Sequence, residues 1–242
     1  RGTVGTSPVA MLERDDAAGE ITSTPALRPK AVRSIRLKWL TPKAYRRWRD
    51  VGLAGYLADG TRDAKWRGRT DGRNLAMSET LWSSGLRLRE GGTLLLGELP
   101  EFEAENRYAR GRVGKAVAKG RGRDYWIHGR ALKLIDNYVI SERDAAVRRA
   151  RREGRYDALP DLKIVQKIDR SRRVHYLSRN GERHVTPLDE LTWKDRMTFF
   201  VKGEDGLEPW MVWLTDGGMP LPYRTWEAVF SDASDRCEAM DV

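Results

Sequence analysis

Cysteine, histidine and long apolar runs are scarce in this chain of 242 residues, and each shortage excludes a class of protein. The one cysteine, Cys237, cannot form an intramolecular disulfide, which excludes a disulfide-stapled domain and favours a reducing, cytosolic setting. Three scattered histidines lack the spacing of metal ligands, so we expect no metal and no other cofactor. The longest apolar run, near Thr93 to Leu96, has the length of a strand and not of a membrane span. We therefore expect a soluble, cytoplasmic protein without a membrane partner.

A clear excess of basic residues is the strongest compositional signal. The chain has 45 lysines and arginines against 35 acidic residues, a formal charge of +10 and a sequence pI near 9.9. This excess favours a polyanionic partner, either nucleic acid or an anionic membrane surface, and says nothing about the fold. Common enzyme signatures are missing: no Gly-x-Ser-x-Gly elbow occurs, and residues 111–116 lack the spacing of a P-loop.

The first part of the chain differs in composition from the rest. Residues 1–36 are rich in Thr, Gly, Ser and Pro and show no apolar periodicity, which predicts a flexible tail or an interdomain linker. The chain begins at Arg1 and not at methionine, so we expect a fragment or a processed product. Residues 37–242 carry the patterns of regular structure and are expected to form one domain.

Helical and extended periodicities in residues 37–242 predict a mixed α/β (α+β) domain. Helices are expected after Thr41-Pro42, over 73–84 with Gly85 as cap, over 130–153 with Gly154 as stop, and over 223–236. Strands are expected over 93–96 with 99–100, and over 112–117, 124–127, 162–168, 174–177, 184–186 and 210–214. Hairpins are predicted around 119–122 and across Asn180-Gly181. These patterns indicate helices packed around a small antiparallel sheet, with a β-hairpin and a β-rich insertion at about 158–190.

Two basic motifs have the chemistry for acting on a phosphate. Gly85-Leu86-Arg87-Leu88-Arg89-Glu90 ends a predicted helix, and Ala118-Lys119-Gly120-Arg121-Gly122-Arg123 occupies a predicted hairpin turn. A guanidinium can hold two oxygens of one phosphate, so Arg87 is the candidate for offsetting charge on a scissile phosphate. A lysine can donate a proton to a departing oxygen, and Lys119 is the candidate for that step.

Simpler explanations exist for the same residues. Taken alone, Arg87 is a basic residue at a helix C-terminus, where the helix dipole favours positive charge, and Lys119 is a solvated turn residue. The carboxylates of Asp189, Glu190 and Asp195 lie near a helix start, where acidic residues ordinarily serve as caps.

The two motifs in this order resemble the tyrosine recombinases, the phage-integrase family. Residues 85–90 are similar to that family's first catalytic arginine box, which a β-sheet follows, with a catalytic lysine on the hairpin between two of its strands. Residues 213–236 are similar to the segment before the second catalytic box, and 143–156 and 207–209 to integrases of actinobacterial mobile elements. The resemblance implies a partial recombinase catalytic domain in which Arg87 and Lys119 are catalytic and Glu90 supports them. Basic residues expected to contact DNA are Arg69, Arg73, Arg121 and Arg123.

For an intact family member, the resemblance implies site-specific DNA recombination and integration in the bacterial cytoplasm. DNA strands are then cleaved and rejoined through a 3'-phosphotyrosine, without a metal. The implied partners are DNA attachment sites and further copies of the enzyme, assembled as a homotetramer on DNA.

Two parts of that active site are absent from the sequence. None of the three histidines is followed three residues later by arginine, so the His-x-x-Arg box does not occur. The last tyrosine, Tyr223, stands at the start of a predicted helix, where we expect it to pack and not to act as the nucleophile. We therefore expect 37–242 to be the N-terminal portion of a recombinase catalytic domain, inactive alone. Two alternatives stay open: a non-catalytic DNA-binding remnant, and a general basic nucleic-acid-binding protein.

Overall fold

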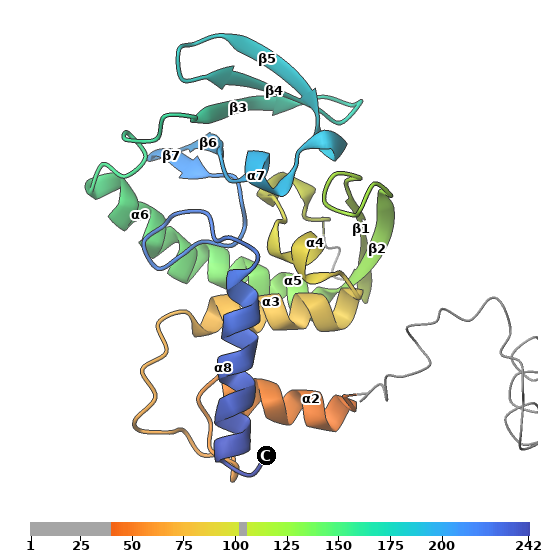
Figure 1. Cartoon of the computed structure of the whole chain (residues 1–242), viewed down its shortest axis with the longest axis vertical. Coiled ribbons are helices and arrows are strands. Elements are labelled where there is room, and N and C mark those ends of the chain that lie inside the picture. Colours follow the sequence, from red (N-terminus) through yellow and green to blue (C-terminus); the bar gives the residue numbers. More distant parts are fainter. Residues whose placement is uncertain (1–39, 102–105) are drawn as a thin grey trace, which may run out of the picture. The chain divides into compact units, whose positions relative to one another are not determined.

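The domain consists of helices that pack around α3 (Asp71–Ser84) and of a five-stranded sheet (Figure 1). The computed structural model describes residues 40–101 and 106–242, and the described residues from Pro42 onward form one compact unit. The tail or linker predicted over residues 1–36 lies outside the described residues. The mixed α/β class expected from the sequence is present.

The four helices expected from the sequence are present. The helices of the described residues are α2 (Pro42–Trp48), α3 (Asp71–Ser84), α4 (Leu88–Gly92), α5 (Gly129–Tyr138), α6 (Asp144–Arg152), α7 (Trp193–Arg196) and α8 (Thr225–Ala239). The third expected helix forms as α5 and α6 in succession, and the short helices α4 and α7 were not expected. The π-helical segments Arg49–Leu53 and Val139–Arg143 extend α2 and join α5 to α6, and 3-10 turns cover Leu96–Glu98 and Leu188–Glu190. Gly85 ends α3 in the left-handed region at φ 62°, with its N–H bonded to the carbonyl of Leu81. Gly154, at φ 63°, follows the run from α5 to α6 as predicted.

The predicted hairpin around Lys119 is present, but its first strand is placed differently. Strands β1 (Tyr108–Val113) and β2 (Arg123–His128) pair antiparallel, so residues 114–122 all belong to the connecting loop. Of the strand expected over 112–117, only Arg112 and Val113 lie in β1, and the rest of the prediction is wrong. Val117 and Ala118 are buried in the hydrophobic core, and their apolar character reflects this docking and not strand pairing.

The sheet has the order β5-β4-β3-β6-β7. Its strands are β3 (Lys163–Ile168), β4 (Arg173–Ser178), β5 (Arg183–Pro187), β6 (Phe199–Gly203) and β7 (Gly206–Pro209). The β4–β5 hairpin turns at Gly181, at φ 85°, as its Asn-Gly sequence predicts. The sequence missed β6 and β7, and β3 pairs with β6 in parallel, so the strands within 158–190 form one mixed sheet with later residues.

Two predicted strands are instead irregular buried segments. Residues 93–96 and 210–214 run antiparallel through a single bridge between Leu95 and Met211, flanked by backbone hydrogen bonds such as that from Val212 to the carbonyl of Leu94. Leu94, Leu95, Met211 and Val212 are all fully buried. A short apolar run predicts burial well and strand pairing poorly, which explains the error.

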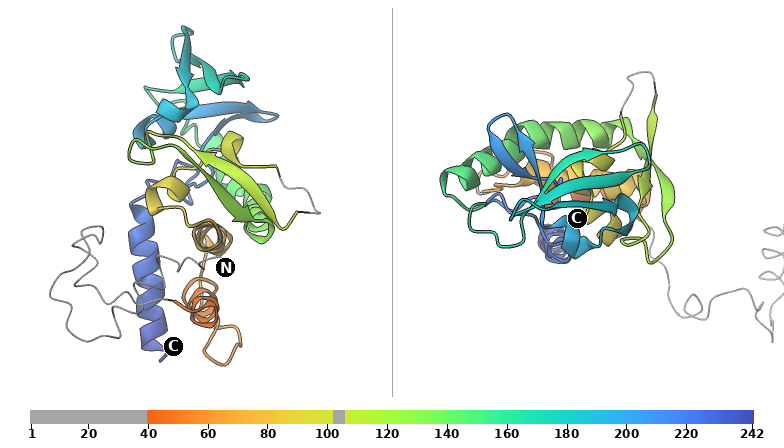
Figure 2. Two further views of the ribbon diagram at one scale, coloured as in Figure 1. Left: turned by 90° about the vertical axis from the view of Figure 1, so that its right-hand side faces the viewer. Right: turned by 90° about the horizontal axis from the view of Figure 1, so that it is seen from above.

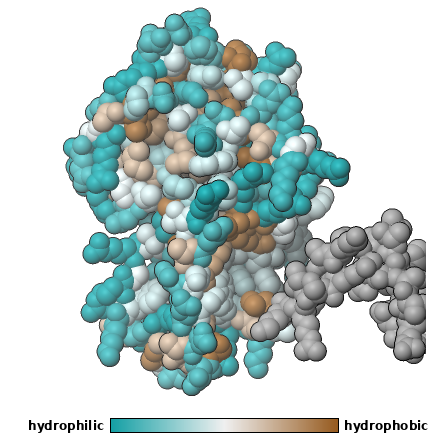
Figure 3. Space-filling model, viewed as in Figure 1, coloured by the Kyte–Doolittle hydropathy of each residue, from teal (hydrophilic) through white to brown (hydrophobic). Residues whose placement is uncertain are grey.

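The core extends from α3 and α8 to the sheet. Trp213 and Trp226 are fully buried with their rings edge to face at 5.7 Å, and the Trp213 indole N–H donates to the carbonyl of Gly91 at 2.7 Å. This packing fixes α4, which carries the arginine motif, against α8 (Figure 2). Hydrophilic residues cover most of the face drawn in Figure 3, with hydrophobic ones scattered between them.

Candidate functional site

Arg87 stands between α3 and α4, two residues beyond the Gly85 cap. Its backbone is extended, with φ −70° and ψ 156°, and it is the N-cap of α4. The predicted position at a helix C-terminus is thus only approximate. The N-terminus of α4 carries a partial positive charge, so the dipole of α4 does not favour a guanidinium there. The Arg87 side chain keeps 59% of its surface exposed.

A buried carboxylate holds Arg87 in place. The Glu90 side chain has no exposed surface, and its oxygens accept hydrogen bonds from the backbone N–H of Arg87 at 2.8 Å and from its Nη1 at 2.9 Å. Burial alone raises the pKa of Glu90, but these two hydrogen bonds and the charges of Arg123 and Arg87 outweigh it, so the pKa lies below its usual value. Glu90 is therefore ionised at neutral pH, and the orienting contact expected of it is present.

The same carboxylate fastens the hairpin to the arginine motif. Arg123, the first residue of β2, donates from Nη2 to Glu90 at 2.7 Å. On the other side of the loop, Arg89 donates from Nε to the carbonyl of Val117 at 2.8 Å. The Lys119 turn lies between these two attachments. Arg87 and Arg123 thus both contact Glu90. Residues 114–122, which we call the lysine loop, are anchored beside them.

Lys119 lies at the tip of that loop in a conformation uncommon for a side-chain-bearing residue. Its φ is 52°, in the left-handed region, and it is followed by Gly120 at 84°. The loop holds this conformation through backbone hydrogen bonds, including one from Gly120 N–H to the Lys115 carbonyl at 2.8 Å. Lys119 and Arg121 are exposed, and within residues 40–101 and 106–242 their side chains make no hydrogen bond or ion pair. Both cations are free to meet an anion.

Of the two upstream arginines expected to contact DNA, one is misplaced. Arg69 is exposed on the loop before α3. Arg73 is buried, donates from Nη1 to the carbonyl of Leu214 at 2.8 Å, and lies over the ring of Trp226 at 5.3 Å. Its prediction as a DNA contact is wrong, because a guanidinium held by the core has no face to offer a phosphate. No local pattern could reveal this partner, because Leu214 lies 141 positions away.

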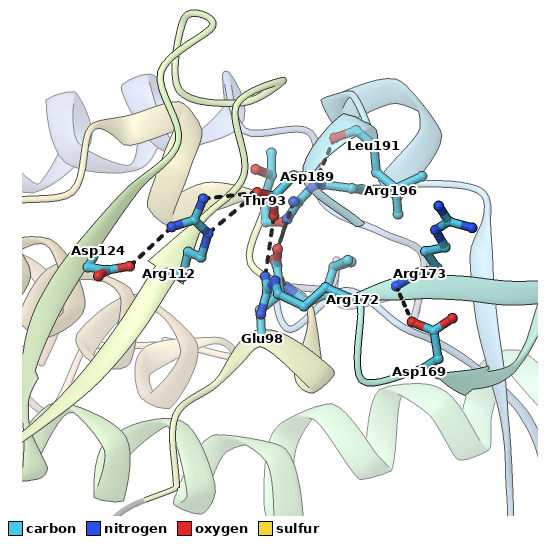
Figure 4. A network of polar contacts seen from close by, with 11 residues as sticks. Thr93, Glu98, Arg112, Asp124, Asp169, Arg172, Arg173, Asp189, Leu191 and Arg196 are labelled. Carbon is cyan, nitrogen blue, oxygen red and sulfur yellow. Dashed lines mark hydrogen bonds and ion pairs between the residues drawn. The ribbon is translucent and has the colours of Figure 1, made fainter. Parts of the chain in front are cut away.

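Sequence reasoning missed an acidic clasp that links the lysine loop to the sheet (Figure 4). We use this name for Asp189 and Glu190, which follow β5. The carbonyl of Asp189 accepts from the Ala116 N–H at 3.0 Å, and its carboxylate lies 3.3 Å from Arg112 and 3.5 Å from Arg172. Lys115 pairs with Glu190 at 2.9 Å.

The clasp revises one interpretation of these acidic residues. They were expected to be helix caps, and only Asp195 is one, since it exchanges hydrogen bonds with Thr192 at the start of α7. Asp189 and Glu190 instead brace a loop far away in the sequence. No local pattern could have distinguished the two roles.

Behind the clasp lies a buried ion pair. Arg196 and Glu98 are each 1% exposed and form two side-chain hydrogen bonds, one of 2.8 Å between Arg196 Nη2 and Glu98 Oε1. Arg196 also donates to the carbonyls of Thr93 at 2.9 Å and Leu191 at 3.2 Å (Figure 4). Nearly all of its donors are used, which offsets the cost of burying its charge. The pair ties the segment after α4 to α7.

A second internal arginine joins two segments that the family resemblance had singled out separately. Arg143 is 2% exposed, pairs with Glu208 at 2.7 Å, and also donates to the carbonyl of Met211 at 3.3 Å.

The described residues contain no group of three or more histidine, cysteine or acidic residues able to bind a metal ion. None of the helices in the described part of the chain combines the length and apolar character that a membrane crossing requires.

No protein-family model, curated protein or solved structure matches this chain. The site therefore has to be judged by its own geometry. It presents a guanidinium at Arg87, anchored by the buried carboxylate of Glu90, and exposed cations at Lys119 and Arg121. Such a surface can bind a phosphodiester and stabilise negative charge on it.

Proposed function

We propose that this chain binds DNA through the arginine motif and the lysine loop, as the N-terminal portion of a tyrosine recombinase catalytic domain. The observation that carries the proposal is the shared carboxylate of Glu90. It contacts Arg87 on one side and Arg123 of the hairpin on the other. Arg123 lies 33 positions from Glu90 in the sequence, so this contact fastens the two motifs to each other, which joint action on one phosphate requires.

The roles proposed for the two cations follow from their surroundings. The Arg87 side chain donates one hydrogen bond to Glu90 and stays mostly exposed, so its remaining N–H groups can bind phosphate oxygens. Lys119 has no side-chain partner among the described residues and lies on a loop that is anchored at both ends, so its ammonium can approach the leaving oxygen and donate a proton. Glu90 acts only by orienting the arginine.

The covalent step lies outside what this chain can do by itself. The 242 residues contain no His-x-x-Arg box. Tyr223 packs against Trp193 with ring centroids 5.5 Å apart. Burial raises the pKa of Tyr138 and of Tyr156 to about 12, which makes each a poor nucleophile near neutral pH. We propose DNA binding and phosphate activation here, with strand exchange, the homotetramer and the bacterial cytoplasmic setting belonging to the intact family member.

Selection from a random duplex library tests the proposal. We expect the chain to enrich a defined sequence, and Arg87→Ala to weaken binding to it by about fivefold, as the loss of one phosphate contact among several. Arg130→Ala, an exposed arginine on α5, is the matched control and is expected to bind as the unsubstituted chain does. A nicked suicide substrate is expected to trap no covalent adduct.

The opposite results separate the alternatives. Absence of DNA affinity would remove the proposal altogether. Binding without sequence preference would favour a general basic nucleic-acid-binding protein. A trapped DNA adduct would show a nucleophile in this chain and contradict the assignment of an incomplete site.

A further inference from the structure

A second basic surface lies on α2 and has no part in the proposed function. Lys43, Arg46 and Arg47 share one face of this helix, because residues three and four positions apart are neighbours on a helix surface. Together with the loop 56–60 they line a groove of about 490 Å³, which we call the α2 groove. All three side chains are exposed.

In the described part of the chain, no acidic side chain pairs with the three cations of the α2 groove. No hydrogen bond or ion pair joins these three cations to a residue within 40–101 or 106–242. The carboxylate in the lining, Asp50, is already bound by Arg49 at 2.7 Å. The neighbouring Asp59 accepts hydrogen bonds from the backbone and hydroxyl of Thr61. Much of the acidic charge nearby is therefore engaged, and the groove attracts anions.

The other wall of the groove narrows the choice of anion. It carries the exposed ring of Tyr56, over which the guanidinium of Arg62 lies at 5.4 Å. Cations interleaved with an aromatic ring, in a concave lining, match the alternating phosphate and sugar of a nucleic-acid backbone. An anionic bilayer is a flat surface into which proteins insert large, exposed apolar side chains, whereas this lining is concave, its Val51 is buried and its Leu57 is partly buried.

We propose that the α2 groove binds the phosphodiester backbone of duplex DNA as a contact separate from the arginine motif. The proposal rests on the proposed function for the choice of DNA as the polyanion. Helix α3 lies between α2 and the β1–β2 hairpin in both directions of view (Figures 1 and 2). DNA held in the groove therefore needs neither Arg87 nor Lys119.

Titration of a labelled duplex by fluorescence anisotropy over a salt series tests the groove. The variant is Lys43→Ala/Arg46→Ala/Arg47→Ala, and the matched control is Lys167→Ala/Arg170→Ala/Arg173→Ala, which removes the same charge from exposed positions around the β3–β4 turn. The groove variant is expected to lose about tenfold in affinity and about 2.7 units of the salt-dependence slope, since each of the three phosphate contacts contributes about 0.9. Thermal unfolding of the groove variant is expected to match that of the unsubstituted chain, because the three side chains are exposed and have no ion-pair partner among the described residues.

Further variants separate this proposal from the proposed function. Arg46→Lys/Arg47→Lys keeps the charge and is expected to keep most of the affinity. In an Arg87→Ala/Lys119→Ala background the groove substitutions are expected to reduce the slope by the same amount, even if the arginine motif proves unrelated to DNA. An unchanged slope, an equal loss in the control, or a loss confined to binding of phosphatidylserine vesicles or single-stranded RNA would each overturn the groove as a duplex site.

Discussion

Arg123 donates to the buried carboxylate of Glu90 across 2.7 Å and so fastens the start of β2 to the arginine motif. Replacing Glu90 with Gln removes the charge that two guanidinium groups share. We expect unfolding in urea to show a loss of about 1–3 kcal/mol, the usual worth of hydrogen bonds to a charged group. The exposed Glu153→Gln is the control and is expected to change stability by less than about 0.5 kcal/mol. If the two substitutions lower the free energy of unfolding equally, Glu90 stabilises the fold no more than an exposed glutamate does.

The contribution of Glu90 to stability should depend on pH. Its pKa in the folded chain lies below the ordinary value of 4.5, so the folded state favours the ionised form. The stabilisation is then fully present above pH 4.5 and is lost as the pH falls through the lowered folded pKa. Urea unfolding at a series of pH values should show the gap between the unsubstituted chain and Glu90→Gln narrowing on acidification. A gap that stays constant or widens would contradict the ionised, paired state.

The acidic clasp is expected to order the lysine loop and not the whole domain. Asp189→Ala removes the partially exposed pairs with Arg112 and Arg172, each worth at most about 1 kcal/mol. Hydrogen exchange at the Ala116 amide and trypsin cleavage after Lys119 should accelerate by up to about 30-fold, the fold-change that two pairs of about 1 kcal/mol each allow. Glu182→Ala, at the β4–β5 turn of the same sheet, should leave both rates unchanged. Unchanged loop rates in Asp189→Ala would remove the clasp from the account.

The buried pair of Arg196 and Glu98 should behave differently from the clasp. Glu98→Gln leaves a guanidinium 1% exposed without its counter-charge, so we expect a loss of about 3–5 kcal/mol in the free energy of unfolding. The double variant Glu98→Leu/Arg196→Met removes both charges and should recover part of that loss. Chemical denaturation of the three proteins measures the difference. A double variant less stable than Glu98→Gln would mean that the remaining hydrogen bonds of Arg196, to Thr93 and Leu191, dominate.

Local backbone chemistry made the helix ends and tight turns predictable from the sequence. Gly85, Gly154 and Gly181 all adopt left-handed φ values at the ends and turns expected of them, because only glycine adopts that conformation at little cost. The apolar runs at 93–96 and 210–214 were predicted as strands and are buried without forming ladders. Periodicity reports burial, and hydrogen-bond partners far away in sequence decide whether a strand forms.

The site was predictable only in part for the same reason. Arg87 and Glu90 are three positions apart, so their contact follows from local geometry. The partners that the sequence missed are remote: Asp189 lies 77 positions from Arg112. Arg73 looked like any other surface arginine, and only its distant contact with Leu214 reveals that it is structural. A composition rich in basic residues does not distinguish cations that face solvent from those that hold the core.

The central claim is that Arg87 and Lys119 act on one phosphate of bound DNA. Replacing single phosphates of the selected duplex by neutral methylphosphonates, one position at a time, and measuring the affinity of each duplex tests this directly. The account predicts one position, or two adjacent ones, at which neutralisation weakens binding of the unsubstituted chain, and at which Arg87→Ala and Lys119→Ala both abolish that penalty. If the two substitutions abolish penalties at phosphates far apart, or at none, the two residues do not form one site and the account is contradicted.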